Sequence, residues 1–397
     1  FNYLEIVAQQ HRLPSAAERA QAISHHPPLH YILASPVYAA TARLSRDAQW
    51  HAVRLWNVVL GGVTLIFVYL TLSTLFPNRP RVSGFGLIFV GWLPHYQLIS
   101  AMHSNDIAAV LFSTITFYLV ARIIAGETQW YLAAGAGLMA GAAVLCKHNA
   151  LLAVFPAGIM AAVSPFFRSA EFEEKRGWTT PLQQAGRIAG ALGGAFLMTG
   201  GAWLARFYLQ WGRLDSDVAW SASQWPVHTF GGKLLWAISG LYRSTWSQVG
   251  WLPGMHSSPP LEPSTLYPRP PVETPLLLLA FPVALLGLIG TITCIARWCK
   301  QAEKRWKAAG GLLLVAAWAL TYAALLHNAM YANPGRFEGG RYALPAVAAT
   351  MSLMAVGPLA LPKENRKIAW WWAAGLLLVM NAVAFYEMFA YLIPTFA

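Results

Sequence analysis

Residues 105–125, NDIAAVLFSTITFYLVARIIA, form a nearly uninterrupted apolar run with an amide and an acid at its start. About 20 mainly apolar residues in a helix are enough to cross the hydrocarbon core of a bilayer. The run therefore predicts a transmembrane helix that begins at Asn105 and Asp106. A carboxylate at the membrane surface is costly without a partner, so this helix start is also a candidate functional site.

The whole chain shares this apolar character. Of its 397 residues, 56% are hydrophobic and only 11% are charged, and the mean hydropathy is +0.44. Soluble domains carry about 25% charged residues. The 18 Trp, 15 Tyr and 19 Phe residues also suit the two headgroup layers, where amphipathic rings are favoured. The composition predicts an integral membrane protein.

The net charge of +12 raises the alternative of a nucleic-acid partner. The basic residues, however, fall in short loops between apolar stretches and do not form one basic domain. We interpret them as topology signals, and we expect the lipid bilayer, and no nucleic acid, as the partner of the chain.

The length rule predicts an all-α polytopic membrane protein with ten spans, if the tightly linked pair 130–146 and 149–167 counts as two. Residues 29–42 are too short to span, so an interfacial helix is expected there. The predicted spans are 54–76, 83–101, 105–125, 130–146, 149–167, 186–208, 275–296, 309–327, 342–361 and 368–391.

The orientation of these spans follows from the positive-inside rule. One set of loops holds half of the 28 Lys and Arg residues and is predicted to be cytoplasmic: Arg79, Arg81, Arg168, Lys175, Arg176, Arg187, Arg297, Lys300, Lys304, Arg305, Lys307, Lys363, Arg366 and Lys367. The opposite, extracytoplasmic face receives the start of the chain, the turns at 102–105 and 147–148, the segment 209–274 and the loop 328–341.

This threading divides the chain into four parts. They are a first extracytoplasmic loop with an interfacial helix (1–52), a transmembrane bundle (53–208), a large extracytoplasmic loop (209–274) and the C-terminal transmembrane helices (275–397). We expect the natural protein to begin before Phe1. The large loop holds a helical stretch from Lys233 to Trp246, and its aromatic content argues against disorder. Trp225, Trp246 and Trp251 could stack on a sugar or rest at the membrane interface.

Three sites on the predicted extracytoplasmic face carry chemistry. Ser104, Asn105 or Asp106 could simply cap a helix, or Asp106 could act in a site. Lys147, in the short turn Lys147-His148-Asn149, could snorkel or could contact a phosphate. Arg336 and Arg341 lie among glycines that let backbone N–H groups approach an anion, although Arg336 could instead pair with Glu338.

The histidine-rich stretch near the start of the chain allows two interpretations. His25, His26 and His30 could bind a metal, but Pro27-Pro28 splits them and no other ligand completes a set. An extended Pro-Pro segment that presents side chains to a cavity is favoured. The cysteines Cys146, Cys294 and Cys299 have no metal-ligand spacing and indicate no disulfide framework.

Together these motifs resemble those of GT-C fold membrane glycosyltransferases, in the broad group of protein O-mannosyltransferases, aminoarabinose transferases and related bacterial enzymes that use polyprenyl-phosphate sugars. The resemblance covers most of the chain. The elements that carry it are Pro27-Pro28-Leu29-His30-Tyr31, Arg54, Asn105-Asp106, the Trp-rich stretch 243–251 and Gly340-Arg341-Tyr342-Ala343-Leu344-Pro345. Two features depart from the pattern. His25 stands where some members of the family have an acidic residue before Pro-Pro, and the first-loop carboxylates of the family are expected upstream of Phe1.

The resemblance implies a GT-C-like helical bundle that transfers a sugar, with inversion, from a polyprenyl-phosphate-linked donor to a glycan, lipid or protein. It also implies a multi-pass protein of the bacterial inner membrane with an outward-facing site in the cell envelope. It assigns Lys147, Arg336 and Arg341 to binding of the donor phosphate. It assigns Asp106 to catalysis, in which the carboxylate would bind a divalent cation or orient the acceptor or donor sugar. His26, Tyr31, Asn105, His148 and Tyr342 would line the substrate cavity.

Two rival hypotheses come from other classes of protein. A transporter or flippase of a lipid-linked or anionic substrate would place ionisable residues near mid-membrane and use broken helices. A scaffold protein would place its function in the loop 209–274 and would not need Asp106, Lys147 or Arg341. The ionisable residues gather at the ends of the predicted spans, which favours an enzyme at the membrane surface.

Overall fold

The structure is a computed structural model that describes residues 2–14, 26–168, 181–212, 229–246, 273–331 and 339–387. In these ranges the regular structure is helical, and eight helices are long and apolar enough to cross a membrane. A bent pair of helices would make a ninth span, and a shorter apolar helix covers Trp130–Cys146. The prediction of an all-α, multi-pass integral membrane protein is confirmed.

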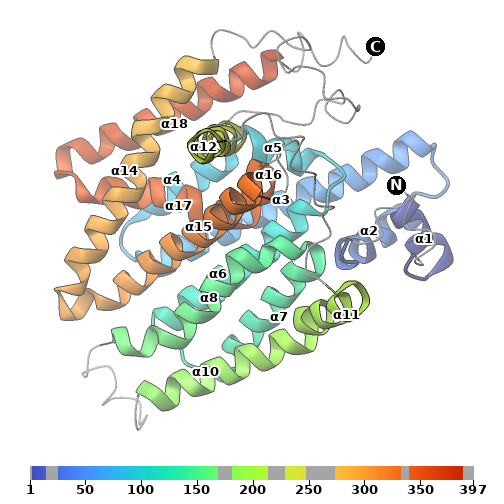
Figure 1. Cartoon of the computed structure of the whole chain (residues 1–397), viewed down its shortest axis with the longest axis horizontal. Coiled ribbons are helices and arrows are strands. Elements are labelled where there is room, and N and C mark those ends of the chain that lie inside the picture. Colours follow the sequence, from blue (N-terminus) through green and yellow to red (C-terminus); the bar gives the residue numbers. More distant parts are fainter. Residues whose placement is uncertain are drawn as a thin grey trace.

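The helices follow the predicted spans closely (Figure 1). In chain order the α-helices are α1 (Asn2–Gln10), α2 (Leu29–Ala40), α3 (Arg46–Leu75), α4 (Pro80–Gly91), α5 (Pro94–Ala101), α6 (Asp106–Ile124), α7 (Trp130–Cys146), α8 (Leu151–Val163), α10 (Pro181–Phe196), α11 (Ala202–Trp211), α12 (Phe230–Trp246), α14 (Glu273–Cys299), α15 (Arg305–Tyr331), α16 (Gly339–Ala343), α17 (Val347–Val356) and α18 (Lys363–Glu387). Short 3-10 turns at His148–Ala150, Ser164–Phe167, Ala302–Lys304, Leu344–Ala346 and Gly357–Ala360, and a π turn at Leu197–Gly201, join or extend them.

The largest shift from a predicted boundary is at the start of α3. This helix begins at Arg46, well before the predicted start at 54. The side chain of Ser45 accepts a hydrogen bond from the backbone N–H of Ala48, and Asp47 adds a negative charge to the first turn. Both features stabilise a helix N-terminus, so α3 extends beyond the apolar stretch.

The predicted span 83–101 is not one straight helix, because the chain is broken there into α4 and α5 with a bend of 60°. Pro94 has no N–H to donate and disfavours the helical conformation of the residue before it. The break leaves backbone carbonyls without helical partners. Side chains satisfy two of them: Gln97 donates to the Gly91 oxygen at 2.8 Å, and Asn381 of α18 donates to the Trp92 oxygen.

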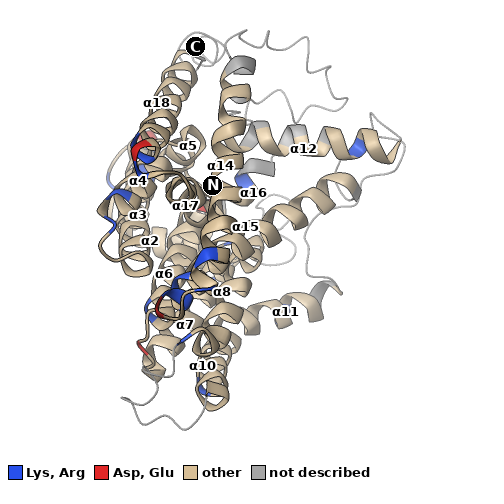
Figure 2. Cartoon of the chain, turned by 90° about the vertical axis from the view of Figure 1, so that its left-hand side faces the viewer, with Lys and Arg blue, Asp and Glu red and all other residues tan. Residues whose placement is uncertain are grey.

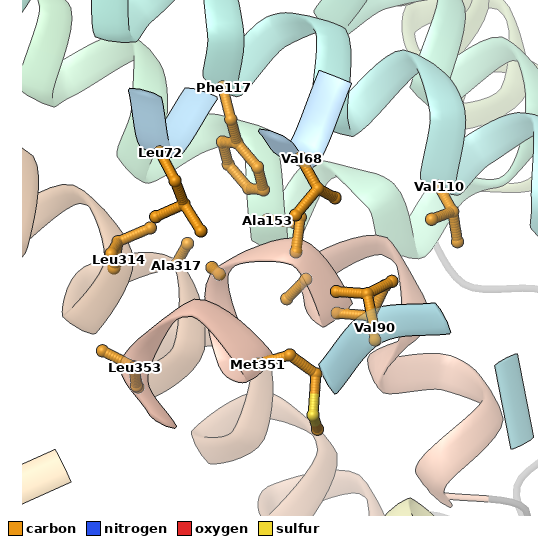
Figure 3. Packing of buried hydrophobic residues seen from close by; sticks show 14 of the residues in the cluster. Val68, Leu72, Val90, Val110, Phe117, Ala153, Leu314, Ala317, Met351 and Leu353 are labelled. Atoms are coloured by element: carbon orange, nitrogen blue, oxygen red, sulfur yellow. The ribbon is translucent and has the colours of Figure 1, made fainter. Parts of the chain in front are cut away.

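The C-terminal half contributes the central element of the core. The span Arg341–Ala360, which includes α17, contains an apolar stretch of 18 residues of which 94% are buried. Figure 3 shows Met351 and Leu353 beside side chains of α3, α4, α8 and α15. Close backbone contact helps this packing: a Cβ at Gly290 of α14 would lie 2.3 Å from the Gly357 oxygen. Small residues allow such approach between membrane helices.

The remaining helices frame this core. Most of the helical ribbon in Figure 2 is drawn in the colour of uncharged residues, as expected for helices that span a membrane. Helices α1 and α2 pack together, against α3 and α7, at the edge of Figure 1 opposite α14. The helix predicted within the large loop is confirmed as α12, which packs against α15 and α16. The other residues of that loop between 213 and 272 lie outside the described ranges.

Candidate functional site

A buried acid with two basic partners lies at the start of α6. The Asp106 carboxylate is fully buried, and its Oδ1 accepts a hydrogen bond from Lys147 Nζ. Its Oδ2 accepts hydrogen bonds from Arg341 Nε at 2.6 Å and from Ser104 Oγ at 2.5 Å. We call Ser104, Asp106, Lys147 and Arg341 the Asp106 cluster. Residues that lie 41 and 235 positions from Asp106 along the chain thus converge on one carboxylate.

The turn before α6 is held in place by two amides. Asn57, fully buried on α3, donates through Nδ2 to the Met102 oxygen at 2.6 Å and to the Ser104 oxygen at 3.1 Å. Asn105 donates to the Cys146 oxygen at 2.9 Å, at the end of α7. The first amide fixes the turn to α3, and the second fixes it to the residue before Lys147.

The arginine of the cluster comes from α16, which is tied to the turn after α7. The Asn149 side-chain amide donates to the backbone carbonyl oxygen of Tyr342 at 2.6 Å. The Lys147 ammonium also lies 4.6 Å from the centroid of the Tyr342 ring, within the range of a cation–π contact. Lys147 therefore contacts both the acid of α6 and the aromatic ring next to Arg341.

These contacts decide between the interpretations left open for Asp106. Its side chain does not act as a simple helix cap, because it binds Lys147 and Arg341 and accepts from Ser104. The N-cap residue Asn105 makes no side-chain capping hydrogen bond, and Ser104 Oγ accepts from the Asp106 backbone N–H at 3.2 Å. With both oxygens bound by cations, Asp106 suits an anchor for basic side chains better than a ligand for a divalent cation.

Lys147 also has a defined partner, so the snorkelling alternative does not describe it. Only 11% of its side chain is exposed, and its ammonium points onto Asp106. Arg341 is similarly covered, with 13% of its side chain exposed. The Asp106 cluster holds one negative and two positive charges, so it is a buried site with an excess of positive charge.

The residues of the Pro-Pro element lie beside this cluster in an aromatic group. Tyr31 stacks on Tyr3 with ring centroids 4.1 Å apart, and its hydroxyl lies 3.4 Å from His26 Nδ1. Burial, and then the nearby Tyr3 and Asp106, raise the pKa of the Tyr31 phenol. His103, in the turn before α6, has its ring centroid 5.5 Å from that of Trp50. Burial is the main cause that lowers the pKa of His103, to about 4.

The other predicted site residues contact side chains outside the Asp106 cluster or lie outside the described residues. The His148 ring accepts a hydrogen bond from Trp203 Nε1 at 2.7 Å and packs edge-on against Phe207, both of α11. Trp246 is buried, with 2% of its surface exposed. Arg336, Glu338, His25, Trp225 and Trp251 lie outside the described residues. In the described part of the chain, no three His, Cys, Asp or Glu side chains group as a metal site.

Two residues of the site were missed by the sequence prediction. Ser104 was considered only as a cap, although it binds Asp106 and lies 3.5 Å from Arg341. Asn57 was not considered at all, although an amide within an apolar span is itself a signal of a polar partner.

Comparison with known proteins finds a family match over part of the chain. A family model described as dolichyl-phosphate-mannose-protein mannosyltransferase matches residues 25–180, a range that contains the Pro-Pro element, Asp106 and Lys147. No curated protein and no solved structure matches the chain. The family match supports a membrane glycosyltransferase, and it confirms the resemblance of this chain to the glycosyltransferases of the GT-C type.

Proposed function

We propose that this chain transfers a sugar, with inversion, from a polyprenyl-phosphate-linked donor to a glycan, lipid or protein acceptor at the extracytoplasmic membrane face. The observation that carries the proposal is the Asp106 cluster, in which one buried carboxylate holds Lys147 and Arg341 side by side. The donor class is supported by the matching family, whose description names a dolichyl-phosphate sugar. The face is supported by the distribution of basic loops.

In this proposal Lys147 and Arg341 bind the phosphate of the donor. Negative charge grows on the phosphate as the glycosidic bond breaks, and preorganised cations in a site that excludes water stabilise that charge. Arg336, which precedes Arg341 by five positions in the sequence, would add a third cation. Arg341 offers a planar fork that suits phosphate oxygens, whereas Lys147 acts as a point charge.

Asp106 is proposed to act by orienting these two cations. Both of its oxygens already accept hydrogen bonds, so neither is placed to take a proton from an acceptor hydroxyl. The general base is then a carboxylate other than Asp106. His26, Tyr31 and Tyr342 are proposed to line the substrate cavity, with Asn105 and His148 supporting its walls.

The transporter hypothesis gains one feature from the structure, the break between α4 and α5. Transporters use the carbonyls freed by such breaks to coordinate ions. Here the Gly91 and Trp92 oxygens accept hydrogen bonds from Gln97 and Asn381. These contacts favour an architectural role for the break and leave the enzyme as the better-supported function.

The test is transfer of radiolabelled sugar from a polyprenyl-phosphate donor pool in membranes that carry the full-length protein. Lys147→Met and Arg341→Ala are expected to abolish transfer at normal protein levels, because each removes a phosphate contact. Arg122→Ala is the matched control. Arg122 pairs with Glu127 at the opposite end of α6, so its loss should leave transfer intact.

A result of no transfer by the wild-type protein, or of transfer unaffected by both site variants, would contradict the proposal. Movement of a lipid-linked substrate across the membrane without sugar transfer would favour the transporter instead.

A further inference from the structure

His30 is a buried histidine that the proposed chemistry does not use. It lies in the first turn of α2, and no part of the residue is exposed. Neither Nδ1 nor Nε2 has a hydrogen-bond partner among the residues that the structure describes. The great majority of buried polar atoms in proteins do have a partner, so two unpaired atoms in one fully buried ring need an explanation.

The neighbours of the ring explain why it stays unpaired. The His30 centroid lies 5.4 Å from that of Tyr31 and 5.6 Å from that of His103, and both contacts are edge-on. Such ring packing satisfies van der Waals contact but supplies no hydrogen bond. The ring is thus surrounded by aromatic side chains that leave both nitrogens without a partner.

The ring is also neutral. Burial, followed by the nearby His103, lowers the pKa of His30 to about 3, although Asp106 acts in the opposite direction. A neutral imidazole offers one N–H donor and one acceptor nitrogen. It therefore matches a group that can both accept and donate, such as a hydroxyl, better than it matches a phosphate.

The position of His30 connects it to the Asp106 cluster. His103 belongs to the turn that leads into α6, and the Cys146 thiol, next to Lys147, interacts with the His30 backbone. Trp56 of α3 packs against both the aromatic group of α1 and α2 and the main core, and its Nε1 is a second buried atom with no partner in the described part of the chain. Buried polar atoms without a partner therefore occur on both α2 and α3 in the described part of the chain.

We propose that His30 binds two hydroxyl groups of the transferred sugar, with one ring nitrogen donating to one hydroxyl and the other nitrogen accepting from the second. This inference rests on the proposed function, since it requires a sugar beside the phosphate held by Lys147 and Arg341. The sugar reaches the ring by displacing the aromatic side chains that cover it. His30 is then a residue of sugar recognition, distinct from the cations that bind the phosphate.

The experiment compares His30→Phe, His30→Asn and the control His51→Phe in the purified full-length protein. Phe keeps an aromatic ring but removes both polar atoms, whereas Asn keeps a donor and an acceptor. His51 is an exposed histidine of α3. Initial transfer rates over a range of donor concentrations give kcat and KM, and thermal unfolding gives the stability of each variant.

We expect His30→Phe to lower kcat/KM by about tenfold or more, as for a lost hydrogen bond to substrate, with an unchanged or higher melting temperature. His30→Asn should recover part of the loss, and His51→Phe should match the wild type. A structural role would instead lower the melting temperature together with the activity.

The possible failures are distinguishable. Transfer by the wild type that is unaffected in His30→Phe overturns this inference alone, as does a fall in melting temperature that parallels the loss of activity. Absence of transfer by the wild type overturns the proposed function and this inference with it.

Discussion

Two fully buried polar groups lie close together in this chain, and they differ in how they are satisfied. Asp106 accepts hydrogen bonds from Ser104, Lys147 and Arg341. His30 has two ring nitrogens and no partner for either within the described ranges. A satisfied buried network fixes its members in one arrangement, whereas unpaired polar atoms are costly until a ligand meets them. The Asp106 cluster is therefore a part of the site that is assembled before substrate binds. In our proposal, His30 gains its hydrogen-bond partners only when substrate binds.

The largest effect is expected from Asp106→Asn, which removes the charge and keeps the shape. Two buried cations would lose their common partner, and breaking a buried ion pair by removing one member costs about 3–5 kcal/mol. We expect a large fall in melting temperature and loss of sugar transfer. Both can be measured on the detergent-solubilised protein.

A double variant sharpens this prediction. Asp106→Asn with Lys147→Met removes one charge of each sign, so it should recover much of the stability lost in Asp106→Asn but none of the transfer. Recovery of transfer in the double variant would contradict the role given to Lys147. An unchanged melting temperature in Asp106→Asn would show that the cluster does not stabilise the fold.

A smaller effect is expected at Asn57, which fixes the turn before Asp106. Asn57→Leu would leave the Met102 and Ser104 oxygens unpaired and should cost about 1–3 kcal/mol. Sugar transfer per folded molecule should also fall, because the carboxylate and its cations would no longer be held in one position.

The matched control is Asn381→Leu. Asn381 is also a buried amide that donates to a backbone oxygen at a break between helices, but it does so at Trp92, between α4 and α5. We expect a similar loss of stability and no change in transfer per folded molecule. Equal losses of transfer in the two variants would mean that Asn57 acts only through general stability.

The smallest effect is on the pH dependence of stability. The pKa of His30 falls from 6.5 to about 3 on folding, so below about pH 6.5 the unfolded chain binds more protons and the free energy of unfolding decreases as the pH falls. Between about pH 7 and about pH 5.5, the wild type should lose about 1 kcal/mol more than His30→Phe. The groups that face His30 are His103, Tyr31, Cys146 and Asp106, and both proteins keep them. Parallel pH profiles would show that His30 does not titrate in this way.

Much of the fold could be predicted from the sequence, because apolar length decides whether a helix can span a membrane. The break at Pro94 was the exception. A proline within an apolar span is often tolerated, and the side chains that satisfy the freed carbonyls come from elsewhere, as Asn381 does from α18. Apolar length alone therefore gives no sign of the bend.

The site was predictable in part. Topology was enough to place Asp106, Lys147 and Arg341 on one face, because each lies at the end of a span. Topology could not show that they share hydrogen bonds, since that depends on how the helices pack. Asn57 was missed because it lies within an apolar span, and His30 was considered only as a possible metal ligand and as part of the Pro-Pro motif.

The separation of these residues along the chain sets an order of assembly during synthesis. Lys147 follows Asp106 by 41 residues, so the acid can gain a counter-charge soon after it enters the membrane. Arg341 follows by 235 residues, which at about 5–20 residues per second is a delay of roughly 10–50 s. The ribosome therefore delivers the second cation only after most of the helices, and a truncated chain that inserts correctly would still lack a complete site.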